Sequence, residues 1–214
     1  MKFLGLIPAR FASTRFPAKP LAMLGGMTVV ERVYRQVRAV MDDVAVATDD
    51  ERIEKAVKDF GGNVVMTSVD HRSGTDRCYE ALMKLGEKKY DVVINIQGDE
   101  PFIQPEQILA VMDCFPTDIA TLAKPYTSQD DLQELLTPNI VKVVFSKQTG
   151  EALYFSRSVI PYLRGEEQHE WLNKGQYFSH IGLYAYRADV LIRITQMPQS
   201  PLEKAESLEQ LRWL

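Results

Sequence analysis

Short apolar runs alternate with helical patterns through the first 114 residues, and this alternation constrains the fold most. The apolar runs, which are typical of buried strands, cover residues 3–7, 44–47, 63–66 and 90–96. Apolar residues at helical spacing follow at 27–40, 51–60, 75–85 and 105–114. Such alternation predicts an α/β fold with a Rossmann-like, mostly parallel sheet covered by helices on both faces. We expect Pro8 to end the first strand, because proline has no N–H for a sheet ladder.

The second half of the chain has a different character. Strand patterns cover residues 118–123, 141–145, 152–155 and 180–186, with few helices between them. This favours antiparallel additions to the sheet or a small lobe. We expect the polar segment 163–177 to be a mobile loop. One interpretation is that this loop acts as a lid. We expect one domain over 1–214, with a nucleotide-binding half (1–117), an antiparallel extension (118–190) and a C-terminal helix (200–214).

Composition excludes several classes of protein. The chain has 214 residues, of which 45% are hydrophobic and 25% charged, and its net charge is −4. An acidic chain is a poor match for nucleic acid or an anionic membrane. No apolar run approaches the roughly 20 residues that span a bilayer. With only a five-residue apolar stretch at the N-terminus, no signal peptide is expected either, so we expect a cytoplasmic protein with free cysteines.

A cationic loop follows the first strand. Arg10, Arg15 and Lys19 lie there, and no acidic residue occurs between positions 2 and 26. In α/β folds the ligand binds at the carboxyl ends of the strands. A loop with three unpaired cations there predicts a polyanionic ligand, best matched by a triphosphate, with Ser13 and the N–H groups of residues 9–13 adding hydrogen bonds. A solvated basic surface loop is the alternative.

The common phosphate-binding signatures are absent from the sequence. There is no G-x-x-x-x-G-K-[ST] and no G-x-G-x-x-G. This disfavours a P-loop nucleoside triphosphatase and a Rossmann dehydrogenase.

Two further polar segments follow strands of the first half. Asp99 comes just after the fourth strand, where one carboxylate and phosphate oxygens together suit Mg²⁺. An aspartate of an ordinary turn is the alternative. In the segment 71–77, Ser73 and Gly74 can present polar groups to a base, and Arg77 can reach a carbonyl or a phosphate. A simple helix N-cap would also explain the serine.

The second half holds the remaining candidates. Arg157 is a lone cation after an apolar strand, and its planar fork suits a carboxylate. His180 begins the last strand, where a structural histidine is the alternative. Glu203, Glu206 and Gln210 have the spacing of one helix face, which is also typical of a solvated acidic surface.

Six segments together resemble the sugar-acid cytidylyltransferase family over residues 2–213. They read I-P-A-R-x-x-S-x-R-x-P-x-K-P-L, H-x-S-G-T-D-R, Q-G-D-E-P, Y-F-S-R-x-x-I-P, H-x-G-x-Y-x-Y and P-L-E-x-x-E-x-L-E-Q-L-R. The later motifs match the branch that activates 3-deoxy-manno-octulosonate (Kdo) best. The resemblance implies CMP transfer from CTP to the anomeric hydroxyl of Kdo, for lipopolysaccharide biosynthesis, by a cytoplasmic homodimer with Mg²⁺.

The resemblance also implies roles for individual residues. The catalytic residues would be Arg10, Arg15, Lys19 and Asp99, with Asp99 as metal ligand. The nucleotide would contact Ala9, Arg10, Ser13, Arg15, Lys19, Ser73, Gly74, Arg77 and Gln97. The antiparallel extension would serve sugar binding and dimerisation. The sugar acid would contact Arg157, His180, Tyr184, Glu203 and Gln210. No side chain is assigned as general base.

Other functions stay open on the sequence alone. CMP transfer to another sugar acid such as sialic acid, isoprenoid cytidylyl transfer and non-catalytic nucleotide binding are the alternatives. Members of the family continue past the position of Leu214 with a V-D-T-P-x-D-L segment, which brings a second metal ligand. A protein that ended at Leu214 is therefore expected to bind CTP weakly and turn over slowly.

Overall fold

The computed structural model describes residues 1–12 and 18–214. The chain forms two compact units, of which the first contains Met1–Thr121 and Gly182–Thr195. The second contains Leu122–Ile181 and Gln196–Leu214. The boundary expected after residue 117 lies close to the first change of unit. The return of residues 182–195 to the first unit was not expected from the sequence.

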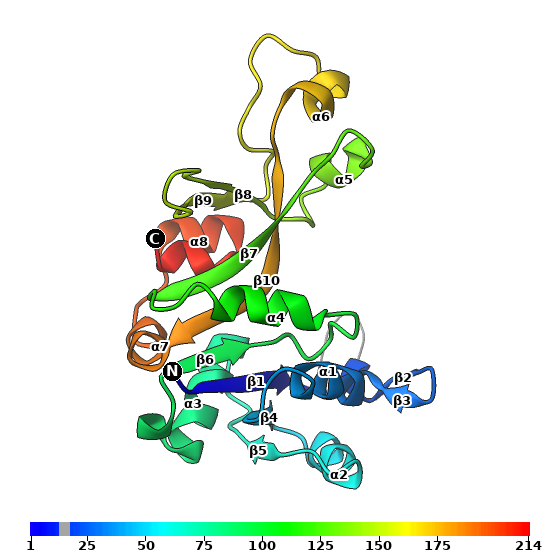
Figure 1. The fold of residues 1–214 in the computed structure, drawn as a ribbon, viewed down its shortest axis with the longest axis vertical. Helices are drawn as coiled ribbons and strands as arrows, with labels where there is room; N and C mark the ends of the chain where they lie inside the picture. Colours follow the sequence, from blue (N-terminus) through cyan, green and yellow to red (C-terminus); the bar gives the residue numbers. More distant parts are fainter. Residues whose placement is uncertain (13–17) are drawn as a thin grey trace. The chain divides into compact units, whose positions relative to one another are not determined.

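The first unit is built on a mostly parallel sheet (Figure 1). Its parallel strands stand in the order β5 (Val64–Met66), β4 (Val44–Thr48), β1 (Phe3–Ala9) and β6 (Val92–Asn95). Strand β10 (Phe178–Arg187) then pairs antiparallel with β6 through Tyr184–Arg187. The mixed, mostly parallel sheet expected from the sequence is confirmed.

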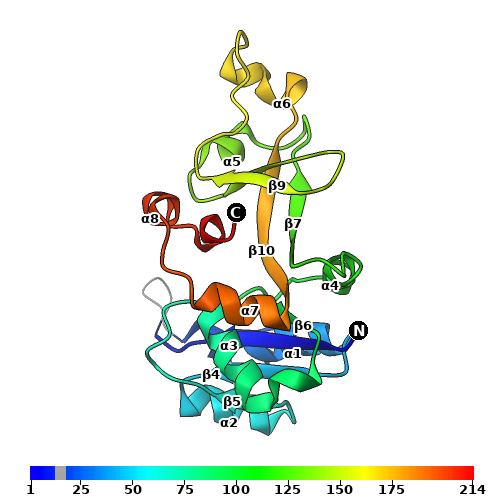
Figure 2. The same ribbon diagram turned by 90° about the vertical axis from the view of Figure 1, so that its left-hand side faces the viewer.

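Helices cover both faces of this sheet, as Figure 2 shows. Helices α1 (Val29–Arg38) and α4 (Pro105–Met112) are in contact, and α3 (Gly74–Leu85) and α7 (Ala188–Thr195) are in contact on the other side. Helix α2 (Glu51–Asp59) packs on β4 and β5. The smaller elements are β2 (Met23–Leu24), β3 (Met27–Thr28) and the 3₁₀ turns Lys19–Leu21 and Glu87–Lys89.

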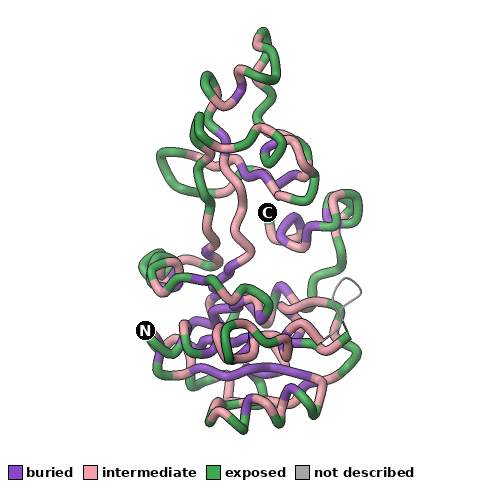
Figure 3. The backbone as a smooth tube through the Cα atoms, turned by 90° about the vertical axis from the view of Figure 1, so that its right-hand side faces the viewer, coloured by how far each residue is buried: buried purple, intermediate pink, exposed green. Residues whose placement is uncertain are grey.

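The local sequence explains where these helices begin. The side chains of Thr28, Asp50 and Ser73 each accept a backbone N–H from the first turn of α1, α2 and α3. Gly61 ends α2 with a positive φ of 79°, a conformation that glycine adopts without a side-chain clash. Figure 3 shows the central strands as buried chain, and Leu6, Val46 and Ile94 expose 0–1% of their surface.

The first strand runs on through Pro8 to Ala9, so the expectation that Pro8 ends it is wrong. The register explains why this proline is tolerated. Beyond Leu6, β1 pairs with β4 alone, where Pro8 lies opposite Ala47. One side of the strand then has no ladder, and a missing N–H on that side removes no hydrogen bond.

The second unit contains most of the antiparallel structure. Strand β8 (Lys142–Phe145) pairs antiparallel with β9 (Ala152–Ser156), and Ser179 of β10 lies opposite Lys142. Strand β7 (Ile119–Pro125) pairs with β10, and both strands begin in one unit and end in the other. The helices of this unit are α5 (Leu132–Leu136), α6 (Trp171–Lys174) and α8 (Pro201–Glu206).

The segment 163–177 is not the irregular loop that its polarity suggested. It contains a 3₁₀ turn at Gln168–Glu170 and helix α6. Trp171 and Tyr177 expose only 2–3% of their surface and pack around Leu135. This cluster joins the segment to α5, which contains Leu135.

The C-terminal stretch is also not one continuous helix. Helix α8 ends at Glu206, because Ser207 has a left-handed backbone with φ of 52°, and Glu209–Arg212 forms a separate 3₁₀ turn. Glu203, Glu206 and Gln210 therefore do not share one helix face. None of the helices that the structure describes is long and apolar enough to cross a membrane.

Candidate nucleotide-binding pocket

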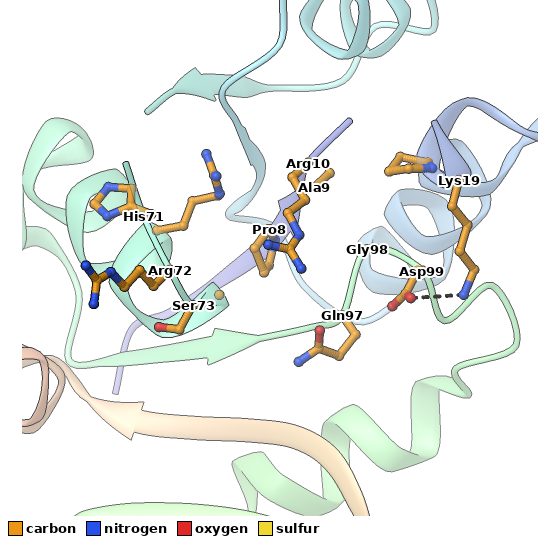
Figure 4. Close-up of a pocket in the computed structure, with 13 residues that line it drawn as sticks. Pro8, Ala9, Arg10, Lys19, His71, Arg72, Ser73, Gln97, Gly98 and Asp99 are labelled. Atoms are coloured by element: carbon orange, nitrogen blue, oxygen red, sulfur yellow. Dashed lines mark hydrogen bonds and ion pairs between the residues drawn. The ribbon is translucent and has the colours of Figure 1, made fainter. Parts of the chain in front are cut away.

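A pocket of about 270 Å³ opens in the first unit at the carboxyl ends of β1 and β6, beside the start of α3. Figure 4 shows His71, Arg72 and Ser73 on one side, Lys19 and Asp99 on the other, and Arg10 between them. The lining residues are Pro8, Ala9, Arg10, Lys19, Pro20, His71, Arg72, Ser73, Gly74, Arg77, Gln97, Gly98 and Asp99. Three segments far apart in the sequence thus meet where an α/β sheet is expected to bind its ligand.

The pocket is rich in positive charge. Arg10 directly follows β1 and Arg72 lies in the loop before α3, and both side chains belong to exposed residues. Among the described residues no carboxylate pairs with either guanidinium. Lys19 begins the 3₁₀ turn Lys19–Leu21 and lines the same pocket. The guanidinium groups of Arg10 and Arg72, which are exposed and have no acidic partner among the described residues, are available to an anionic ligand.

Asp99 faces this positive charge. Its Oδ2 accepts from Nζ of Lys19 at 2.9 Å, and the two side chains are 51% and 39% exposed. A salt bridge this exposed to solvent contributes little to stability, so both groups can exchange partners readily. Gly98 brings the segment close to β1, because a Cβ at this position would lie 2.6 Å from the backbone oxygen of Pro8. The close approach requires a glycine and fixes where Asp99 emerges.

The loop before α3 forms the opposite wall. The hydroxyl of Ser73 accepts the N–H of Asp76 at 3.1 Å and donates to its carboxylate at 2.9 Å, so this serine does cap α3. Gly74 lies against the ring of Pro8, at 3.3 Å from the position of an added Cβ. The capping role and the place in the pocket are compatible.

Arg77 lines the pocket but is tied elsewhere. It exposes 3% of its surface. Its Nη2 donates to Asp49 at 2.8 Å, and its Nη1 donates to the hydroxyl of Thr67 at 2.6 Å. The prediction that Arg77 contacts the nucleotide stays a prediction. In this structure two of its guanidinium nitrogens donate hydrogen bonds to Asp49 and Thr67 within the protein.

The structure brings together the predicted metal ligand Asp99 and seven of the predicted nucleotide-site residues, namely Ala9, Arg10, Lys19, Ser73, Gly74, Arg77 and Gln97. Ser13 and Arg15 lie outside the described residues. His71 and Arg72 also line the pocket and had no role in the sequence analysis. Their position in the same H-x-S-G-T-D-R segment was the signal that would have found them.

The predicted sugar-site residues do not line this pocket, and Arg157 makes hydrogen bonds within the second unit. In the second unit its Nε donates to the carbonyl of Glu206 at 2.7 Å, and its two terminal nitrogens donate to the carbonyls of Pro138 and Ser207 at 3.0 and 3.3 Å. Each of the three guanidinium nitrogens thus donates to a backbone carbonyl in this structure, and the prediction that Arg157 contacts the sugar acid stays a prediction.

Glu203 is likewise committed to structure. Its carboxylate receives Nε and Nη2 of Arg212 at 2.8 and 2.6 Å, and the side chains of this pair are 6% and 11% exposed. It also accepts the N–H of Ser200 in the capping box of α8. The carboxylate thus accepts several hydrogen bonds within the protein, and the prediction that Glu203 contacts the sugar acid stays a prediction.

The other sugar-site candidates are largely buried. His180, in the second unit, meets the ring of Phe155 edge to face at 4.9 Å, and burial lowers the pKa of His180 to about 4. Gln210, also there, exposes 6% of its surface. Tyr184, in the first unit, exposes 9% and stacks on Tyr186 at 5.9 Å. Their predicted contacts with a sugar stay predictions.

The comparisons with known proteins identify the family of the chain. The family model described as "Cytidylyltransferase" matches residues 4–214. A 3-deoxy-manno-octulosonate cytidylyltransferase of Bacteroides thetaiotaomicron is 64% identical, over 100% of this chain and 86% of the relative. The relative of that name from Porphyromonas gingivalis is 53% identical, over 99% of this chain and 84% of its own length.

Solved structures lead to the same family. The structure of CMP:2-keto-3-deoxy-manno-octonic acid synthetase complexed with CTP matches with a TM-score of 0.88 and 43% identity, over 99% of this chain and 85% of the other. A cytidylyltransferase from Leptospira borgpetersenii, at 16% identity and a TM-score of 0.60, shares the fold. With the cationic pocket at the carboxyl ends of β1 and β6, these matches lead to one conclusion: the chain belongs to the cytidylyltransferase family.

Proposed function

We propose that the protein transfers CMP from CTP to the anomeric hydroxyl of Kdo and releases pyrophosphate. One observation carries this proposal. Arg10, Lys19 and Asp99 converge on one pocket at the carboxyl ends of β1 and β6, in a chain 64% identical to a relative named as a Kdo cytidylyltransferase.

The cations supply what transfer from a triphosphate requires. The oxygen of the anomeric hydroxyl attacks the α-phosphorus in line and loses its proton to solvent, a new P–O bond forms, and the bond from the α-phosphorus to the bridging oxygen of pyrophosphate breaks. Negative charge grows on the leaving pyrophosphate, and Arg10 and Lys19 are placed to neutralise it. Arg15 and Ser13 are proposed to add to the same binding site.

The base of CTP is proposed to lie against the loop before α3. Ser73 and Gly74 present backbone groups there, and the tight contact of Gly74 with Pro8 holds them in place. Ala9 and Gln97 line the pocket between this loop and Asp99. The pairing of backbone donors and acceptors with cytosine is the proposed source of base selectivity.

Mg²⁺ is the proposed cofactor, and the pocket residues fit it in one respect. Asp99 is half exposed and faces the pocket cations, so it can offer one hard oxygen ligand. No cluster of three metal-binding side chains occurs within residues 1–12 and 18–214. This donor set suits an ion held mainly by nucleotide phosphates and water. When bound, Mg²⁺ supplies charge neutralisation at the phosphates.

The acceptor site is supported by the relatives rather than by the pocket. His180, Tyr184 and Gln210 are proposed to contact the sugar acid, as are Arg157 and Glu203, which also make hydrogen bonds within the second unit. A cytoplasmic homodimer in lipopolysaccharide biosynthesis is the proposed setting.

A pyrophosphate-release panel tests the function. The four nucleoside triphosphates are each combined with Kdo or sialic acid, in the presence of Mg²⁺. We expect release only with CTP and Kdo. Release with sialic acid but not Kdo would replace the proposed acceptor. Tight CTP binding without release under any condition would favour a non-catalytic binding protein.

A further inference from the structure

Two carboxylates outside the nucleotide pocket each hold a basic side chain that lines it. Asp49 lies just after β4 and pairs with Arg77, and Glu80 lies in the middle of α3 and pairs with His71. Neither acid is among the residues that line the pocket, while both of their partners are. The sequence analysis gave these two acids no role.

The Asp49–Arg77 pair joins the ends of two neighbouring strands. Arg77 donates to Asp49 after β4 at 2.8 Å, and to the hydroxyl of Thr67 after β5 at 2.6 Å. The side chains of the pair are 16% and 4% exposed. Charged hydrogen bonds shielded from water are strong and fix geometry, because either partner left alone would be a poorly solvated charge.

Glu80 is the centre of the second set of contacts. One carboxylate oxygen accepts the N–H of Ser68 at 2.9 Å and contacts Nε2 of His71, and the other pairs with Lys84 at 2.7 Å. Burial alone would raise the pKa of Glu80, but hydrogen bonds from Lys84, Ser68 and His71 lower it to about 2. The carboxylate is therefore charged at neutral pH.

Both sets of contacts act on one stretch of chain. From one side, Arg77 fixes Thr67, and its Nη1 lies 3.4 Å from the carbonyl of Ser68. From the other side, Glu80 fixes the N–H of Ser68 and the ring of His71. The segment from residue 67 to 73 is thus anchored at several points just before its last residues reach the pocket.

We propose that Asp49 and Glu80 are positioning residues for nucleotide binding. They hold residues 67–73 in the binding conformation before CTP arrives. The conformational entropy of this segment is therefore lost during folding and does not weaken the binding of CTP. The bond from Glu80 to Nε2 of His71 also determines that the other ring nitrogen, Nδ1, is the one left for a ligand. This inference rests on the proposed function, since it names how the same pocket is kept ready for CTP.

Three substitutions and a matched control test the proposal. Asp49→Asn and Glu80→Gln remove the charge of each carboxylate, and Glu80→Ala removes all the side-chain contacts of Glu80. Glu54→Gln on α2 is the control, because Glu54 makes the same kind of pair with Lys58 at 2.7 Å, is 27% exposed against 23% for Glu80, and holds no loop. The dissociation constant of CTP is measured by titration calorimetry, together with the KM values for CTP and Kdo and the kcat.

We expect Asp49→Asn and Glu80→Ala to weaken CTP binding about tenfold or more, since the first leaves the buried Arg77 charge without its carboxylate and the second removes the hydrogen bonds of Glu80. The KM for CTP should rise while the KM for Kdo stays within about twofold of wild type. Glu80→Gln keeps an oxygen for the Ser68 N–H, so it should recover part of the loss, and Glu54→Gln should bind as wild type does.

The outcomes separate the two levels of the argument. If the wild-type protein binds no CTP, the proposed function fails. If wild type binds CTP and the three variants bind it as Glu54→Gln does, the positioning role is overturned.

A second test uses the wild-type protein alone, so that it does not depend on whether the variants fold. The Ser68 amide should be protected from hydrogen exchange without CTP, and protection only after CTP is added would also overturn the proposal.

Discussion

The buried ion pair between Glu203 and Arg212 gives the sharpest prediction of stability. Its two charged hydrogen bonds measure 2.6 and 2.8 Å, and the side chains are 6% and 11% exposed. Glu203→Gln keeps the shape of the side chain but removes its charge, which leaves a guanidinium with little solvent around it. We expect a loss of about 3 kcal/mol, the low end for breaking a buried pair. That corresponds to a fall in Tm of about 6–12 °C for a chain of this size.

Urea unfolding followed by tryptophan fluorescence is a suitable assay. Trp171 and Trp213 are the only tryptophans of the chain, and both lie in the same unit as the ion pair. The exposed Glu167, which forms no ion pair with the described residues, provides the control Glu167→Gln, expected to stay within about 0.5 kcal/mol of wild type. Equal stability of wild type and Glu203→Gln would refute the argument that this carboxylate serves structure.

The pH dependence gives a second readout of the same pair. Hydrogen bonds from Arg212 lower the pKa of Glu203 from its ordinary 4.5, although burial acts to raise it. A carboxyl with a lowered folded-state pKa stabilises the protein above its unfolded-state pKa, and that contribution is lost as the pH falls. The difference between wild type and Glu203→Gln should therefore be full at pH 7 and shrink below about pH 4.5.

Three further predictions concern the pocket and His180. Lys19→Met should raise the KM for CTP about tenfold in pyrophosphate-release kinetics and move the stability by less than about 1 kcal/mol, since its pair with Asp99 is exposed; an unchanged KM would remove Lys19 from the site. Gly98→Ala places a Cβ 2.6 Å from the oxygen of Pro8 and should cost about 1–3 kcal/mol in urea unfolding, with a higher KM for CTP; a normal Tm and KM would contradict it. Burial lowers the pKa of His180 to about 4, so wild type should lose stability as the pH falls from 6.5 toward 4, by about 3 kcal/mol in total. His180→Asn should lack this loss, and the same pH profile in both proteins would show that His180 is not its source.

The sequence predicted the first unit well because its signals are local. Apolar runs and helical spacing record in the local sequence which faces of an element are buried. Little more than the order of the strands is needed to predict that β1 pairs with β4 and β6. The first loop, Asp99 and the Ser73 segment were expected together because parallel strands end at one edge of the sheet. The structure places their described members around one pocket.

The sequence failed where a residue's role depends on distant partners. Nothing beside Arg157 shows that the carbonyls of Pro138 and Ser207 will meet its guanidinium. The break in the C-terminal helix rests on the left-handed conformation of Ser207, which serine adopts rarely. The path of β1 through Pro8 depends on which side of the strand lacks a neighbour. Each of these features depends on tertiary contacts that the local sequence does not show.

The central claim is that the cationic pocket beside β1 binds the phosphates of CTP. Titration of CTP into wild type and Arg10→Met tests it most directly, because Arg10 is exposed and pairs with no described carboxylate, so the substitution should leave the fold intact. We predict that Arg10→Met has the wild-type Tm and binds CTP at least about tenfold more weakly. An Arg10→Met protein that binds CTP as tightly as wild type would contradict the claim.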